Sequence, residues 1–191
     1  MTETIDTLIH SDQELFLALN GMHYPWLDTV MYWITFKYTW VPMYLILIFF
    51  SIKPGVKKGF GIILTVIIAV AIADKITSGL MKPYFIRYRP CHDPDLKSLV
   101  HQVTGCGGLY GFASSHASTS FAVAITWFAL LRSSVPYIGL LFVWAAIYSY
   151  SRVYVGVHYP ADIFVGAIVG LVTGWVCIQG YYFFLRKYSH T

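Results

Sequence analysis

A histidine and an aspartate stand four residues apart in the segment SRVYVGVHYPAD, residues 151–162, between two strongly apolar stretches. Pro160 lies between them and favours the first turn of a helix, because this turn leaves its N–H groups unpaired and proline has none. The spacing allows Asp162 to accept the N–H of the His158 imidazole, which leaves the other ring nitrogen available to attack. Taken alone, the segment could also be a capped helix preceded by a histidine.

Three cationic side chains accompany this pair. Lys82 and Arg89 lie seven residues apart in KPYFIRYRP, residues 82–90, and Arg152 belongs to the segment above. Lysine and arginine bind phosphate through charge-assisted hydrogen bonds, so the three cations suit a phosphate group. Such side chains also anchor helices at a membrane surface, which is the structural alternative.

A second histidine follows two hydroxyl groups in FASSHAST, residues 112–119. Ser114, Ser115 and His116 open an apolar stretch, where a helix N-terminus would offer unpaired N–H groups and a positive dipole end to an anion. The serines could instead be simple N-caps. Structural roles for all three segments on one face would be a coincidence, so a shared phosphate pocket is the stronger interpretation.

The elements that carry these segments are predicted to be membrane helices. Of 191 residues, 57% are hydrophobic and 12% charged, and the mean hydropathy is +0.61, whereas soluble domains average about 25% charged residues. Five apolar stretches approach or exceed the roughly 17 to 25 residues of a spanning helix. They are Tyr24–Ile52, Gly59–Met81, Ala117–Leu131, Val135–Tyr150 and Ala161–Leu185. We therefore expect an all-α membrane protein with about five transmembrane helices, of which residues 24–36 could lie along the interface.

Residues 1–191 form a single integral membrane domain in this interpretation. The N-terminal segment, residues 1–23, is acidic where a signal peptide is basic, so we expect it to remain on the mature chain. Its apolar residues at helical spacing are Leu8, Leu15, Phe16 and Leu19. They predict an interfacial amphipathic helix or an ordinary packed helix.

Basic residues divide unevenly between the two sides that five spans would create. One side holds Lys53, Lys57, Lys58, Arg132, Arg186 and Lys187, and the other holds Lys82, Arg87, Arg89, Lys97 and Arg152. If Lys82, Arg89 and Arg152 are set aside because catalysis retains them, six basic residues on the first side stand against two on the other. The positive-inside rule then places the first side in the cytoplasm. The three motifs would then face the periplasm or the exterior of a bacterial-type inner membrane.

Together the three segments resemble the motifs of the type 2 phosphatidic acid phosphatase family, with a likeness that extends over roughly Gly59–Leu185. The first motif, Lys, six residues and Arg-Pro, matches Lys82–Pro90, and the third, Ser-Arg, five residues, His, three residues and Asp, matches Ser151–Asp162. The second, Pro-Ser-Gly-His, reads Ala-Ser-Ser-His at 113–116. The freedom of glycine to adopt a positive φ and to approach an anion closely is lost at Ser115.

The resemblance implies a metal-independent lipid phosphatase, a phosphoric ester or acid anhydride hydrolase that needs no cofactor. It implies that His158 attacks phosphorus to form a phosphohistidine while Asp162 holds the ring. His116 would protonate the leaving oxygen and later activate water. Charge on the phosphate would be stabilised by Lys82, Arg89, Ser114 and Arg152.

Other polar residues near these motifs have open interpretations. Asp74 shares a helix face with Ser78 and Lys82, so it could orient Lys82 without touching the phosphate, or it could only satisfy a structural hydrogen bond. Ser115 is a candidate for the same supporting role. Arg87 matches no motif position and is a lesser candidate.

The outer loop, residues 91–113, carries two further possibilities. His92, Asp93, Asp95 and His101 could bind a metal, but their spacing fits no familiar site, and a solvated loop is the favoured interpretation. Cys91 and Cys106 fall on the oxidising side of this topology while Cys177 lies inside a span, which predicts a 91–106 disulfide.

Three classes of function compete for this pattern. A phosphatase acting on a membrane lipid needs the His–Asp pair; a non-catalytic anion-binding or transport protein does not. Vanadate-type haloperoxidases have a similar pocket but are soluble.

We expect the phosphatase, with the bilayer and a lipid phosphate as partners and no nucleic acid; the oligomeric state is not predicted. Undecaprenyl diphosphate, phosphatidylglycerophosphate and lipid A phosphates all fit an outward pocket.

Overall fold

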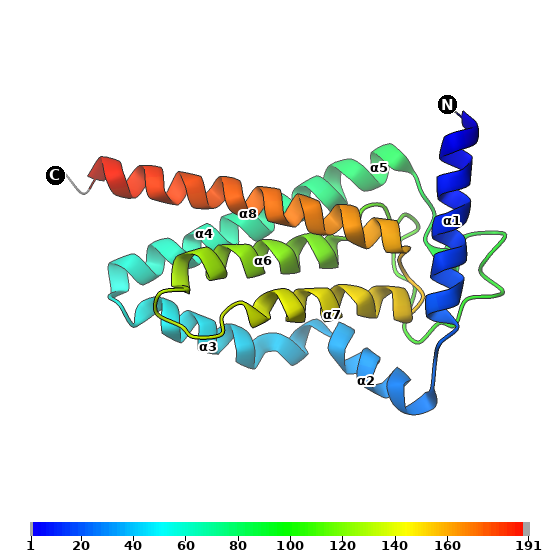
Figure 1. Cartoon of the computed structure of the whole chain (residues 1–191), viewed down its shortest axis with the longest axis horizontal. Coiled ribbons are helices and arrows are strands. Elements are labelled where there is room, and N and C mark those ends of the chain that lie inside the picture. Colours follow the sequence, from blue (N-terminus) through cyan, green and yellow to red (C-terminus); the bar gives the residue numbers. More distant parts are fainter. Residues whose placement is uncertain (1, 189–191) are drawn as a thin grey trace.

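The computed structural model describes residues 2–188, and within that range the chain is helical and has no β-strand (Figure 1). The elements are α1 (Thr2–Asn20), α2 (Pro25–Thr35), the 3₁₀ turn η1 (Lys37–Trp40), α3 (Val41–Ile52), α4 (Val56–Asp74), the π-helical segment η2 (Lys75–Met81), α5 (Lys82–Phe85), the 3₁₀ turn η3 (Pro90–His92), α6 (Ser115–Leu131), α7 (Leu140–Tyr154) and α8 (Pro160–Tyr188). The predicted all-α class is confirmed.

The helices α3, α4, α6, α7 and α8 run along the long axis of the molecule, with α6 packed against α8, α4 and α7 (Figure 1). Aromatic side chains fill the space between α3, α6 and α7. Trp127 and Trp144 are buried there, and the Trp127 indole N–H donates to the Ser51 hydroxyl at 3.1 Å. Burying apolar surface of this size contributes most of the packing energy among the helices.

Glycines bring α6 and α8 into close contact. Gly166 and Gly170 lie where a Cβ atom would collide with the carbonyl oxygens of Ser114, the N-cap residue of α6, and of Ser118. Small residues four apart allow two helix backbones to approach closely in a membrane. The N-termini of the two helices consequently meet, and the Ser114 N–H donates to the Asp162 carbonyl oxygen at 2.9 Å.

The first predicted span is broken. α2 and the segment Lys37–Ile52 meet at an angle of 66°, and the break falls at Phe36, which has extended backbone. The prediction that residues 24–36 could lie along the interface stays a prediction, to which this bend gives a possible starting point.

Length and composition identify fewer spans than we expected. Val56–Phe85 and Pro160–Lys187 are long and apolar enough to cross a membrane, and the bent pair α2 and Lys37–Ile52 would be a third. α6 and α7 have 17 and 15 residues, which lie at and below the lower limit of roughly 17 residues for a spanning helix. The count of five stays a prediction.

The N-terminal helix α1 stands across one end of the bundle (Figure 1). Phe16 is fully buried against Tyr159, with ring centroids 5.3 Å apart, and the Asn20 amide donates to the carbonyl oxygen of Tyr154 at 2.8 Å. Leu8 and Leu15 remain 65% and 50% exposed. α1 therefore packs through its C-terminal half and still presents apolar side chains outward.

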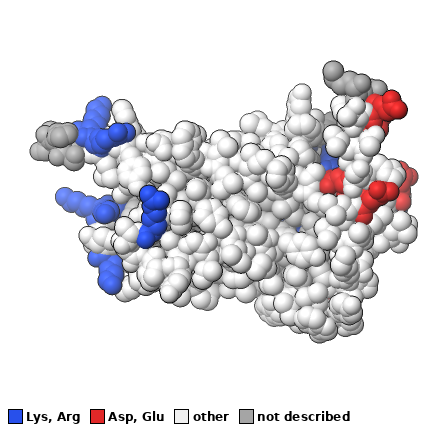
Figure 2. All heavy atoms as spheres, viewed as in Figure 1, with Lys and Arg blue, Asp and Glu red and all other residues white. Residues whose placement is uncertain are grey.

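Charge separates the two ends of the molecule (Figure 2). Acidic side chains gather at the end where α1 lies, and basic side chains gather at the end where α8 finishes. The apolar middle between them is the region that a bilayer would cover.

Candidate active site

His158 and Asp162 form the centre of the site. His158 lies in the loop between α7 and α8, and Asp162 lies in the first turn of α8. The two side chains are 1% and 0% exposed, and His158 Nδ1 is 3.1 Å from Asp162 Oδ2. The same carboxylate oxygen accepts the Tyr159 N–H at 3.1 Å, which fixes the orientation of the carboxylate.

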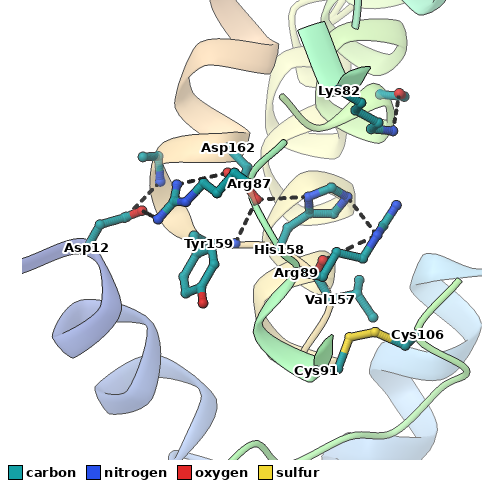
Figure 3. A network of polar contacts seen from close by, with 12 residues as sticks. Asp12, Lys82, Arg87, Arg89, Cys91, Cys106, Val157, His158, Tyr159 and Asp162 are labelled. Atoms are coloured by element: carbon teal, nitrogen blue, oxygen red, sulfur yellow. Dashed lines mark hydrogen bonds and ion pairs between the residues drawn. A yellow bond between two sulfur atoms is a disulfide. The ribbon is translucent and has the colours of Figure 1, made fainter. Parts of the chain in front are cut away.

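Arg89 faces the other ring nitrogen of His158. Its Nη1 lies 3.2 Å from His158 Nε2 and 3.2 Å from the Val157 carbonyl oxygen (Figure 3). A guanidinium can only donate and a carboxylate can only accept, so the partners are consistent with a neutral ring that carries its proton on Nδ1. Burial, followed by the positive charges of Arg89 and Arg152, lowers the pKa of His158 well below its usual value. Nε2 is therefore an unprotonated nitrogen next to a cation.

Each of the three motifs also contains a buried donor without a partner. Among the described residues, the Ser114 hydroxyl and the Nε atoms of Arg89 and Arg152 are buried without a hydrogen bond. A buried donor that stays unpaired costs about 1 to 3 kcal/mol. The three predicted motifs each contribute one such atom, and a phosphate would supply the missing acceptors.

Lys82 is held by a chain of hydroxyl groups. Its Nζ donates to the Ser115 hydroxyl at 2.9 Å, which lies 2.7 Å from the Ser78 hydroxyl. Ser78 in turn donates to Asp74 Oδ1 at 3.1 Å. Asp74 is thus linked to Lys82 through two serines, as the shared helix face suggested, and the serine in the place of the motif glycine is one of them.

His116 lies at the boundary between the polar site and an apolar cavity. Its ring centroid is 5.3 Å from that of Tyr148. It borders a cavity of about 720 Å³, which runs between apolar residues such as Ile48, Val70 and Val123. A smaller cavity of about 300 Å³ joins His116 to Arg152, whose Nη1 donates to the Thr35 hydroxyl at 2.6 Å.

Gly111 is a site residue that the sequence analysis missed. A Cβ atom on this glycine would lie 3.0 Å from Asp162 Oδ2 and 3.4 Å from His158 Nδ1. Any other side chain would crowd the pair. Only its position just before FASSHAST could have drawn attention to it.

The outer loop is tied down by covalent and polar contacts. Cys91 and Cys106 are joined in a disulfide (Figure 3), as predicted. His101 Nε2 lies 2.9 Å from Asp28 Oδ1, and Asp93 accepts a hydrogen bond from the Tyr159 hydroxyl at 2.9 Å. Within residues 2–188, no three His, Cys, Asp or Glu side chains gather as metal ligands would.

The family model for the PAP2 superfamily matches residues 58–186. The chain belongs to this superfamily. The match spans nearly the same residues as the resemblance found from the three motifs, and it confirms the predicted family and its class of enzyme, a phosphatase.

Two curated relatives and one solved structure resemble this PAP2 chain over most of their lengths. A lipid A 4'-phosphatase of Porphyromonas gingivalis is 37% identical over 89% of this chain and 72% of that protein. A lipid A 4'-phosphatase of Bacteroides thetaiotaomicron is 34% identical over 96% and 80%, respectively. The crystal structure of Aquifex aeolicus LpxE superposes with a TM-score of 0.67 and 26% identity, covering 87% of this chain and 93% of that one. The apolar helices and these relatives together indicate an integral membrane protein.

Proposed function

We propose that this PAP2 chain is a lipid phosphatase that hydrolyses a phosphate ester of lipid A through a phosphohistidine intermediate. The geometry at His158 carries the proposal. An unprotonated Nε2 faces Arg89, Nδ1 is held by a buried carboxylate, and the motifs contribute buried, unpaired donors of Ser114 and Arg152. This arrangement provides a nucleophile and a site for negative charge in the same place.

A two-step reaction follows from these positions. His158 Nε2 attacks phosphorus, the bond to the lipid oxygen breaks, and His116 gives that oxygen a proton. His116 then takes a proton from water, whose oxygen attacks the phosphohistidine, releasing phosphate and freeing His158. Lys82, Arg89 and Arg152 stabilise charge on the phosphate oxygens in both steps. Because cations of the chain perform this task, no metal is part of the proposal.

The cavity beside His116 supports a lipid as the leaving group. It holds about 720 Å³ and is lined largely by apolar side chains of α3, α4, α6 and α7. An acyl chain placed there would have its polar end at His116, where the proton is needed. Among the three lipids that fit an outward pocket, the names of the two curated relatives favour lipid A, and we propose its 4'-phosphate as the substrate.

We propose five spans, in the order α2 with α3, α4 with η2 and α5, α6, α7 and α8. Residues 1–191 would form one domain, with α1 and the loop 91–113 on the outer face. An odd number of spans agrees with the two chain ends lying at opposite ends of the bundle (Figure 1). The basic end would be cytoplasmic by the positive-inside rule, so the site would face the periplasm (Figure 2).

The substrate is tested by phosphate release from purified protein in detergent or in vesicles. Lipid A carrying a 4'-phosphate, undecaprenyl diphosphate and phosphatidylglycerophosphate are compared, with His158→Ala as the blank. Faster phosphate release from lipid A than from the other two lipids supports the proposal. Faster release from one of the others would identify that lipid as the substrate instead. No release above the blank from any of them contradicts a lipid phosphatase.

The orientation is tested by reporter fusions. A reporter active only in the periplasm should be active when inserted at Lys97 and silent when fused after Thr191. The opposite pattern would place the site in the cytoplasm.

A further inference from the structure

The N-terminal helix reaches the catalytic aspartate through one arginine. Arg87 Nη2 lies 2.7 Å from Oδ2 of Asp12 on α1, and Arg87 Nη1 lies 3.0 Å from Asp162 Oδ1 (Figure 3). Asp162 uses its other oxygen for His158. The four side chains thus form one continuous line, Asp12, Arg87, Asp162 and His158, which runs from the first helix to the nucleophile.

This line is shielded from solvent along most of its length. The side chains of Arg87 and Asp12 are 21% and 12% exposed, and that of Asp162 is 0% exposed. Ion pairs at this depth are screened by water much less than surface pairs. Losing one partner leaves the other with an uncompensated charge, which makes such a contact costly to break.

Arg87 is also fixed in position by packing. Its guanidinium carbon lies 4.1 Å from the centroid of the Tyr159 ring, and that ring is held from α1 by Phe16 and from the outer loop by Asp93. Stacking on an aromatic face and pairing with two carboxylates suit the planar guanidinium, whereas a lysine could not do all of these at once.

Asp12 has a second contact at the same place. Its Oδ1 accepts the Ala161 N–H at 2.9 Å, which is one of the amides that the N-terminus of α8 leaves without a helical partner. α1 therefore stabilises the first turn of the helix that carries Asp162.

We propose that Asp12 and Arg87 are positioning residues for the His158–Asp162 pair, and that α1 is accordingly part of the catalytic apparatus. Arg87 satisfies Asp162 Oδ1, a buried acceptor, and prevents the carboxylate from rotating away from the imidazole. Asp12 holds Arg87 and balances its charge, so that Asp162 keeps enough negative character to stabilise the imidazolium form during attack. The inference rests on the proposed role of His158 as nucleophile.

The test compares purified variants in two assays, rapid-quench formation of phosphohistidine and steady-state turnover. Arg87→Gln removes the charge of the bridging residue. Arg87→Lys keeps the charge but lacks the planar guanidinium that pairs with two carboxylates. Asp12→Asn removes the carboxylate charge but keeps an oxygen for the Ala161 N–H, and Asp12→Glu keeps the charge. Asp6→Asn is the matched control, because Asp6 is exposed on the same helix.

We expect Arg87→Gln to slow phosphohistidine formation about 10- to 100-fold, the range expected for losing a hydrogen bond to a buried charge. KM should change little, because Arg87 pairs with carboxylates and does not touch the phosphate. Arg87→Lys and Asp12→Asn should lie between wild type and Arg87→Gln, and Asp12→Glu should recover part of the loss. Adding Asp12→Asn to Arg87→Gln should cost little more, since Asp12 acts through Arg87.

Three results would overturn the inference: unchanged phosphohistidine formation in Arg87→Gln and Asp12→Asn, losses confined to KM, or losses that Asp6→Asn shares. If Arg87→Gln does not fold, shown by its thermal unfolding in detergent, Asp12→Asn and Asp12→Glu decide the question. All variants are also assayed on p-nitrophenyl phosphate. Wild-type turnover of this ester without turnover of any lipid phosphate would refute the proposed substrate class, while the variants would still decide the role of Asp12 and Arg87.

Discussion

The two histidines of the site occupy contrasting surroundings. His158 is 1% exposed and held on both ring nitrogens, by Asp162 on one side and Arg89 on the other. His116 is the second residue of α6, lies beside the Tyr148 ring and borders two cavities. The proposed nucleophile is thus oriented before substrate arrives, whereas the proposed acid faces the space that the lipid would fill.

This difference follows from what each group must do. A nucleophile gains from being fixed, because correct orientation removes entropy from the barrier before the reaction starts. A general acid must meet the leaving oxygen of a flexible lipid, and its contribution depends on how basic that oxygen is. The mutations that separate the two histidines should therefore differ in kind as well as in size.

The largest effect is expected for His158→Ala. With the attacking nitrogen removed, turnover of every phosphate ester should fall to background, because the proposed reaction has no other nucleophile. Release of labelled phosphate measures this, and His92→Ala, a partly exposed histidine of the outer loop, is the control. Residual turnover with labelled phosphate trapped on His116 would reverse the two roles.

His116→Ala should reduce activity in a way that depends on the leaving group. Hydrolysis of a lipid monophosphate should fall by about 10²- to 10⁴-fold, the usual contribution of a general acid or base. p-Nitrophenyl phosphate should retain more activity, because its leaving group needs no proton. Equal losses on the two substrates, measured as kcat/KM, would give His116 a binding or structural role instead.

Gly111→Ala should slow turnover on both substrates, by about 10-fold or more, because small displacements of reacting groups have large effects on rate. Its Cβ would press on Asp162 Oδ2 and His158 Nδ1. Gly108→Ala is the matched control, since a Cβ there would meet nothing within 4 Å. An unchanged kcat in Gly111→Ala would show that His158 and Asp162 tolerate displacement and are not held rigidly.

The smallest effect is expected from chelation. In the proposed reaction, Lys82, Arg89 and Arg152 supply the positive charge that a divalent ion provides in many phosphoryl-transfer enzymes. Phosphate release should therefore be unchanged after treatment with EDTA. Activity that is lost on chelation and restored by magnesium would contradict the proposed division of labour between the two histidines and the cations.

Much of the site could be predicted because its parts are local in sequence. His158 and Asp162 are four residues apart, and the geometry of a helix start brings them together wherever the helix lies. The link from Asp74 through Ser78 towards Lys82 follows the same periodicity. The motifs also fixed the family and the class of enzyme, since their order and spacing are specific as a set.

Other features could not be predicted, because they join distant parts of the chain. Arg87 matched no motif position, yet it bridges Asp12 and Asp162, each 75 residues away from it. The N-terminal helix was expected to be interfacial or simply packed, and nothing local indicated that it touches the site.

The sequence by itself determined that this protein is a helical membrane protein of the PAP2 superfamily, because hydropathy and short motif spacings act locally. Only the tertiary structure decided which side chains surround the candidate site. The glycines of α8 set how closely α6 approaches, and this approach brings Ser114 to Asp162. The packing of α1 against the start of α8 then brings Asp12 to Arg87. Contacts of this kind depend on how whole helices pack, and no window of neighbouring residues contains that information.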